Sequence, residues 1–84
     1  MKFLVEATNT KDVTPFLDAE AKRAAELRAA GTLTSLWLKA DYSGAFLLLE
    51  CADEAAAHAA LGSLPLVVND ATRYALTAVI DDPR

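Results

Sequence analysis

The sequence predicts an α+β domain with elements in the order βαββαβ, a ferredoxin-like fold in which an antiparallel sheet carries two helices on one face. Three observations lead to this prediction. Four segments alternate apolar and polar residues, two alanine-rich helical segments separate them, and turn residues 41–44 join the middle pair. With 84 residues, of which 54% are hydrophobic, we expect a single domain over residues 1–84 with one core.

The four predicted strands are residues 2–8, 32–40, 45–49 and 72–80. The third is apolar on both faces, which indicates that both faces of the sheet are covered, one by helices and the other by the sheet of a second subunit. We therefore expect a homodimer. The alternation predicts these face groups: Phe3, Val5 and Ala7; Leu36, Leu38 and Ala40, opposite Leu33, Ser35, Trp37 and Lys39; and Tyr74, Leu76, Ala78 and Ile80.

Both helices have terminal signals. Thr14, followed by a proline, predicts the first helix start with the threonine hydroxyl as cap. This helix is expected to reach Ala30, where Gly31 ends it in a left-handed conformation. Asp53 is the predicted cap of a second helix that runs to about Leu61.

Composition excludes several classes of protein. The net charge is −4 and the basic residues are scattered, so no nucleic-acid partner is expected. No apolar run is long enough to span a membrane and no targeting leader is apparent, which favours a cytoplasmic protein. The single Cys51 allows no internal disulfide and is predicted to be a buried filler with a raised thiol pKa. No cofactor motif or metal-ligand spacing is found, so we expect neither.

One carboxylate lies where an apolar residue is expected. In the first helix Glu20 falls on the stripe formed by Phe16, Leu17, Ala24 and Leu27. Burial there would raise its pKa toward the range in which a carboxyl group takes and returns a proton. The alternative is structural: the side chain reaches solvent along its methylenes, or pairs with Arg23.

Four short motifs keep a common register without a gap between Glu20 and Leu66: Gly31-Thr32, Leu36-Trp37, Ala40 and Leu64-Pro65-Leu66. On these residues the chain resembles the muconolactone isomerase family, and the match extends over nearly the whole chain. It places Glu20 on the proton-transferring glutamate of that family and His58 on a second-helix histidine. It implies sheet-to-sheet dimers in a dimeric α+β barrel, a higher homo-oligomer, and a substrate pocket between helices and sheet.

The departures from the family pattern concern the substrate. Leu38 replaces the arginine that follows the family's tryptophan, so a group to hold a substrate carboxylate is missing. The nearest basic substitutes are Lys39 and Arg73. The substrate is therefore expected to differ from muconolactone.

Three functions remain open at this stage. The first is an isomerase that shifts a double bond in an unsaturated lactone or related carbonyl compound, in aromatic catabolism or secondary metabolism. Its catalytic residue would be Glu20, and its substrate-binding residues would be Trp37, Lys39, His58 and Tyr74. The second is a non-catalytic dimeric module that binds a small ligand or assists another enzyme. The third is a cofactor-independent monooxygenase on the same scaffold.

Overall fold

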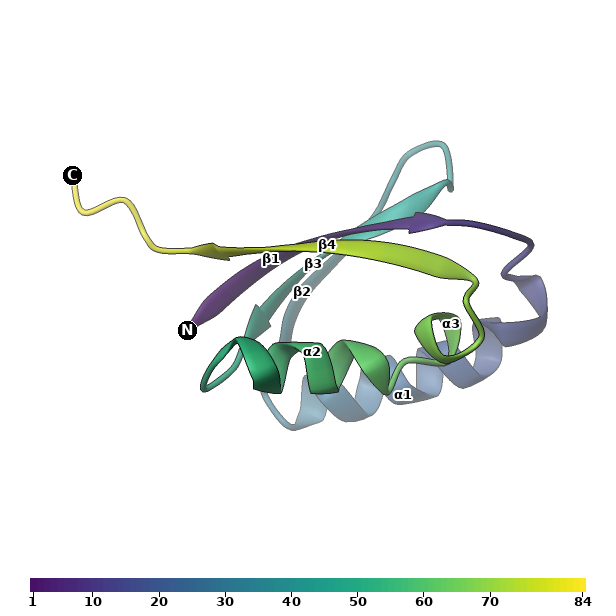
Figure 1. Cartoon of the computed structure of the whole chain (residues 1–84), viewed down its shortest axis with the longest axis horizontal. Coiled ribbons are helices and arrows are strands. Elements are labelled where there is room, and N and C mark those ends of the chain that lie inside the picture. Colours follow the sequence, from purple (N-terminus) through teal and green to yellow (C-terminus); the bar gives the residue numbers. More distant parts are fainter.

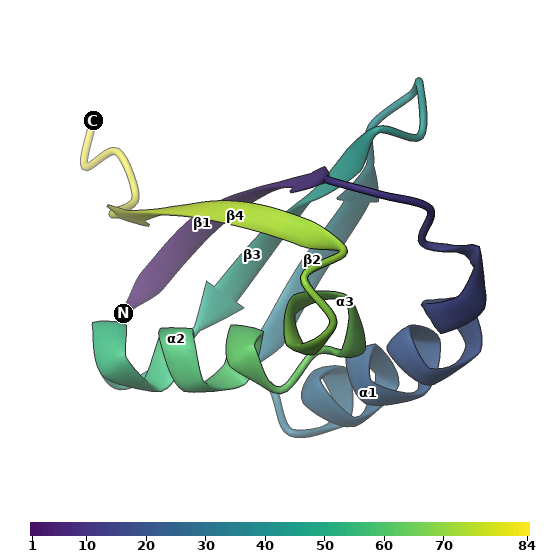
Figure 2. The same cartoon turned by 45° about the vertical axis from the view of Figure 1, so that its right-hand side comes forward.

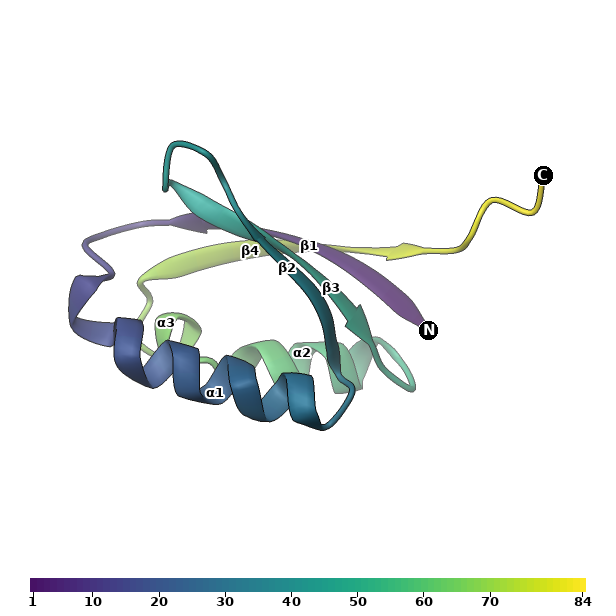
Figure 3. The ribbon, with the colours of Figure 1, turned by 180° about the vertical axis from the view of Figure 1, so that it is seen from behind.

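The computed structural model describes residues 1–84 and has the predicted ferredoxin-like α+β fold (Figure 1). The antiparallel sheet has the order β2-β3-β1-β4, formed by β1 (Lys2–Asn9), β2 (Leu33–Leu38), β3 (Gly44–Glu50) and β4 (Thr72–Val79). The helices are η1 (Thr14–Phe16, 3₁₀), α1 (Leu17–Ala29), α2 (Glu54–Gly62) and α3 (Pro65–Val68). Views from opposite sides show α1, α2 and α3 on one face of the sheet, with no element over the other face (Figures 1 and 3). None of the helices is both long and apolar enough to cross a membrane.

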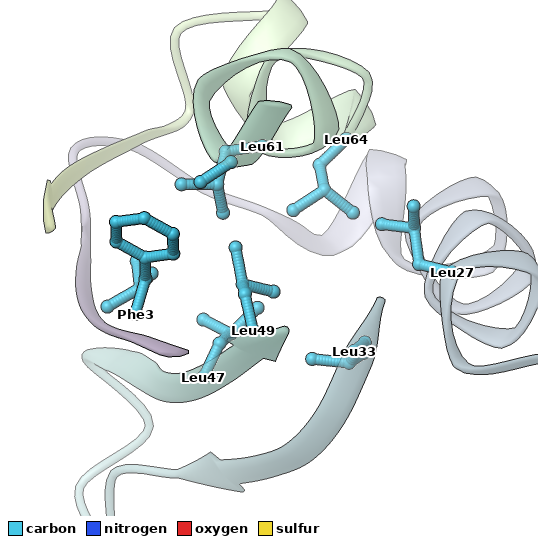
Figure 4. Close-up of a cluster of buried hydrophobic side chains, with 9 residues drawn as sticks. Phe3, Leu27, Leu33, Leu47, Leu49, Leu61 and Leu64 are labelled. Atoms are coloured by element: carbon cyan, nitrogen blue, oxygen red, sulfur yellow. The ribbon is translucent and has the colours of Figure 1, made fainter. Parts of the chain in front are cut away.

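The core lies between the sheet and the helices (Figure 4). In the register of β1, Val5 is opposite Leu47 on one side and Leu76 on the other, so their side chains share the helix-facing side of the sheet. The buried cluster is completed from both layers by Phe3, Leu27, Leu33, Leu49, Ala57, Leu61 and Leu64.

The helix starts agree with the sequence prediction in one case and differ in the other. Asp53 caps α2, since its carboxylate accepts a hydrogen bond from the Ala56 amide at 2.8 Å. The prediction that Thr14 caps the first helix is wrong, because the chain enters α1 through the 3₁₀ turn η1. The carboxylate that accepts the Thr14 amide hydrogen, at 3.0 Å, belongs to Asp12 two residues earlier.

Two predictions about strand faces are also wrong. Leu33 does not share a face with Trp37: it is buried in the core, because a register irregularity between Leu33 and Ser35 turns the strand by one residue. Ile80 does not continue the inner face of β4, and 89% of its surface is exposed. It lies beyond the last pair of the ladder, in which Val79 is opposite the first residue of β1.

Gly44 and Gly62 give a matched test of the packing. Gly31 has the predicted left-handed conformation, with φ of 80°, but Gly44 is required for a different reason. A Cβ at Gly44 would overlap the carbonyl oxygen of Ala7 on the neighbouring strand, whereas a Cβ at Gly62 would meet nothing within 4 Å.

We expect Gly44→Ala to lower the free energy of unfolding by about 1–3 kcal/mol, because β1 and β3 would have to separate. Gly62→Ala, at the end of α2, should raise it by about 0.5–1 kcal/mol through the lower entropy of the unfolded chain. Urea denaturation of both variants measures these changes. Equal stability of the two variants would show that the close approach of β1 and β3 is not a constraint.

Candidate active site

A cavity of about 460 Å³ separates α1 and α3 from the helix-facing side of the sheet. This volume is within the range of small-molecule sites. Its 20 lining residues include 16 hydrophobic ones, and they come from every strand and from all three α-helices. Figure 2 shows the arrangement of these elements, with α3 between α1 and β4. The apolar walls comprise Val5, Ala7, Val13, Leu17, Ala21, Ala24, Leu36, Leu38, Ala45, Leu47, Leu61, Leu64, Leu66 and Val67.

Glu20 is the one charged residue among those that line the cavity. It is half-buried, and its Oε1 accepts a hydrogen bond of 2.9 Å from the backbone amide of Leu66. Pro65 occupies the first position of α3 and has no N–H, so the Leu66 amide is the first free donor of that helix. The carboxylate of α1 thus completes the start of α3, and its second oxygen has no hydrogen-bond partner in the protein.

Burial raises the pKa of the Glu20 carboxyl above its ordinary value, and the hydrogen bond from the Leu66 amide opposes part of this rise. No cation compensates the burial. Arg23, the candidate partner one turn along α1, instead donates from Nε to the hydroxyl of Ser63 at 2.9 Å, and its Nη1 lies 3.7 Å from Glu26. The alternative in which Glu20 pairs with Arg23 is therefore wrong.

Tyr74 and His58 come together at the β4 side of the cavity. Tyr74 lines the cavity, and its hydroxyl lies 2.7 Å from Nδ1 of His58 on α2. The other ring nitrogen of His58 lies 3.4 Å from a carboxylate oxygen of Glu54, one helical turn away. His58 does not itself line the cavity. It contacts the hydroxyl of Tyr74, which does.

Trp37 and Lys39 lie on the opposite side of the sheet from the cavity. Trp37 is paired with Phe46, while its neighbours Leu36 and Leu38 line the cavity, as the alternation of a strand requires. Lys39 forms an ion pair of 2.9 Å with Glu6 on the same outer face. The structure therefore does not bring these two residues together with Glu20.

Three further polar residues line the cavity that the sequence did not indicate: Asn9, Tyr42 and Thr72. Tyr42 has φ of 61°, a left-handed conformation that is uncommon for an aromatic residue, and Asn9 donates a hydrogen bond of 3.3 Å to its carbonyl oxygen. The turn was recognisable from its residue types, but nothing in the pattern indicates that the β2–β3 turn folds back toward the end of β1.

Cys51 is half-buried against the core and does not line the cavity. Burial raises the pKa of its thiol, and the nearby carboxylates of Glu50 and Asp53 add to the rise. The predicted direction of this shift is confirmed, and the thiol is not activated as a nucleophile.

Fold and cavity together define a small ferredoxin-like α+β protein with an apolar interior site that contains one carboxylate. The family model of muconolactone delta-isomerase matches residues 1–78. The chain belongs to the muconolactone delta-isomerase family. A search of curated protein sequences found no significant match.

Solved structures share the fold. A muconolactone isomerase superposes with a TM-score of 0.82 at 22% identity, covering 99% of this chain and 92% of the other. The 5-chloro-2-hydroxyhydroquinone dehydrochlorinase of Burkholderia phenoliruptrix AC1100, in complex with 2,5-dihydroxybenzoquinone, has a TM-score of 0.76 at 17% identity, with 98% and 96% coverage. A cofactor-independent oxygenase from Streptomyces nogalater, at 16% identity, covers 98% and 94% with a TM-score of 0.47, too low to support a functional argument.

The raised pKa of Glu20 predicts how stability depends on pH. Because the folded protein retains the Glu20 proton to a higher pH than the unfolded chain does, this group's contribution is fully present below the unfolded pKa. It is lost as the pH rises through the folded pKa. The free energy of unfolding of the wild type should therefore fall across this window relative to that of Glu20→Gln.

Urea denaturation of both proteins from pH 4 upward measures this difference, and NMR titration of the Glu20 carboxyl gives its pKa directly. The same comparison with Glu26→Gln, at an exposed position of α1, controls for general charge effects. A Glu20 pKa at or below the ordinary value would contradict the burial argument.

Proposed function

We propose that this protein is an isomerase that shifts a double bond in an unsaturated lactone or related carbonyl compound, with Glu20 as the group that moves the proton. The observation that supports this role is the position of one unpaired, half-buried carboxylate in an otherwise uncharged cavity. Family membership supports the reaction class. No cofactor is needed for this reaction.

The chemistry requires one acid–base group in two steps. The Glu20 carboxylate removes a proton from the carbon between the carbonyl and the double bond, and the C–H electron pair enters the conjugated system as a dienolate. The carboxylic acid formed then returns the proton to the far carbon of that system. The substrate is neither oxidised nor reduced, and the carboxylate is regenerated.

The surroundings of Glu20 suit both steps. Most of the cavity wall is apolar, and burial raises the pKa of the carboxyl so that it becomes a stronger base than an exposed glutamate. The Leu66 amide holds one oxygen in a fixed position and leaves the other for the substrate. Tyr74, held by His58, would provide a hydroxyl at the wall of the same site.

A second function is favoured by a specific observation. Because Glu20 already accepts the first free amide hydrogen of α3, its position has a structural explanation that needs no catalysis. The protein would then be a small-ligand-binding module with the same cavity. The two functions differ in what they require of the carboxylate: basicity in one, and only an acceptor oxygen in the other.

Glu20→Gln and Glu20→Ala separate these functions. Glutamine keeps an acceptor for the Leu66 amide but is not a base, so turnover should fall by about 10²–10⁴-fold at nearly unchanged stability. Alanine removes both properties and should also lower the free energy of unfolding by about 1–3 kcal/mol.

NMR in D2O, with the uncharged lactone α-angelica lactone as probe, measures proton exchange beside the carbonyl and the formation of the conjugated isomer. Urea denaturation measures stability. If Glu20→Gln isomerises the lactone as fast as the wild type, the glutamate is only a cap of α3 and does not move the proton. If the wild type binds the lactone without isomerising it, the binding module is the correct function.

We also propose that two copies associate through the outer face of the sheet, as a homodimer or as the unit of a higher homo-oligomer. This face exposes a group of apolar side chains around the ion pair of Lys39 with Glu6: Leu4, Trp37, Phe46 and Leu48. Trp37 has 53% of its surface exposed, a large apolar area for a chain that is not associated.

Trp37→Lys should raise the dissociation constant of the dimer at least tenfold, because association would bury an additional, unpaired positive charge beside the ion pair of Lys39 with Glu6. The control is Val68→Lys on the helical side, where 64% of the residue's surface is exposed and no interface is proposed. Sedimentation velocity over a concentration series measures both. A monomeric wild type, or equal effects of the two substitutions, would reject association through the sheet.

A further inference from the structure

We infer that the ligand of the cavity is uncharged, an apolar carbonyl compound that carries no carboxylate. This inference deepens the proposed function, since it specifies the substrate of the same site. Muconolactone itself carries a carboxymethyl group, so the inference separates the substrate of this chain from the compound after which its family is named.

The charge of the cavity walls is the first argument. Among the 20 lining residues there is no lysine, arginine or histidine, and Glu20 is the one charged group. A carboxylate that enters would lose its hydration without gaining a cation, and it would meet a second negative charge in the same apolar space. A neutral ligand avoids both the loss of hydration and the repulsion by Glu20, and it leaves Glu20 free to act on a C–H bond.

The basic residues near the cavity are the second argument, because none of them is among its lining residues. Arg23 binds Ser63, and Lys39 binds Glu6 on the other side of the sheet. The ammonium group of Lys11 lies 6.0 Å from the ring centre of Phe16. Arg73, adjacent to Tyr74 in β4, alternates to the outer face and does not line the cavity.

The remaining polar groups of the cavity are the third argument. Asn9 donates to the carbonyl of Tyr42, and Thr72 donates to the carbonyl of Thr8 at 3.1 Å. Tyr74 is held by His58. The side-chain groups without a partner inside the protein include the Tyr42 hydroxyl, on a residue with 78% of its surface exposed, and the second oxygen of Glu20. The hydroxyl can donate a hydrogen bond to a carbonyl oxygen, whereas the carboxylate oxygen can only accept, so the rest of the ligand would be held mainly by apolar contact.

Two probes of nearly equal shape test the inference: muconolactone, which is an anion at neutral pH, and its uncharged methyl ester. Isothermal titration calorimetry with the wild-type protein should give at least a tenfold lower dissociation constant for the ester. In Glu20→Gln the dissociation constant of the anion should fall toward that of the ester, because one of the two like charges is gone.

A gain of anion binding provides the converse test. Leu38 lines the cavity with 66% of its surface exposed, so a long basic side chain is tolerated there without loss of core packing. Leu38→Arg should improve the relative affinity for muconolactone at least tenfold, and Leu38→Lys should do so in the same direction. Leu38→Met is the matched uncharged control and should keep the preference for the ester.

These outcomes separate the inference from the proposed function. Anion binding as tight as ester binding in the wild type, or binding of neither probe, overturns the inference whatever the turnover. Preferential binding of the ester without isomerisation in D2O leaves the inference intact and contradicts the proposed catalysis. Preferential binding with turnover that depends on Glu20 supports both.

Discussion

The hydrogen bond from the Leu66 amide to Glu20 is the interaction on which the site depends. It links the first turn of α1 to the start of α3, through two residues that are 46 positions apart in the chain. Without this donor the buried carboxylate would lose its one polar contact, and α3 would lose the partner of its first free amide. The same contact therefore supports the local fold and holds the group to which the chemistry is assigned.

The sheet separates two environments with different chemistry. Its inner face contributes apolar side chains to the core and to the cavity walls, and the charged pair of Lys39 and Glu6 is confined to the outer face. Each strand reaches both environments because its side chains alternate. This separation explains how a chain with 24% charged residues forms a cavity with a single charge.

Much of the fold could be predicted from the sequence because it depends on local periodicity. The order of elements, the Asp53 cap and the left-handed Gly31 all follow from residue types at fixed spacing. The position of Glu20 toward the interior could also be predicted. Its partner could not, because Leu66 approaches only through the tertiary packing of α3 on α1, and the bulge at Leu33 leaves no mark on the hydrophobic pattern.

The irregularity between Leu33 and Ser35 decides which side chains of β2 reach the cavity. It places Leu33 in the core and still leaves Leu36 and Leu38 at the cavity, so Trp37 and Lys39 must face outward. If the same residues were paired without this irregularity and Leu33 stayed in the core, the far half of the strand would be inverted, and the indole ring and the ammonium group would enter the cavity. The register of one edge strand thus decides whether this wall of the cavity is aliphatic or carries a cation.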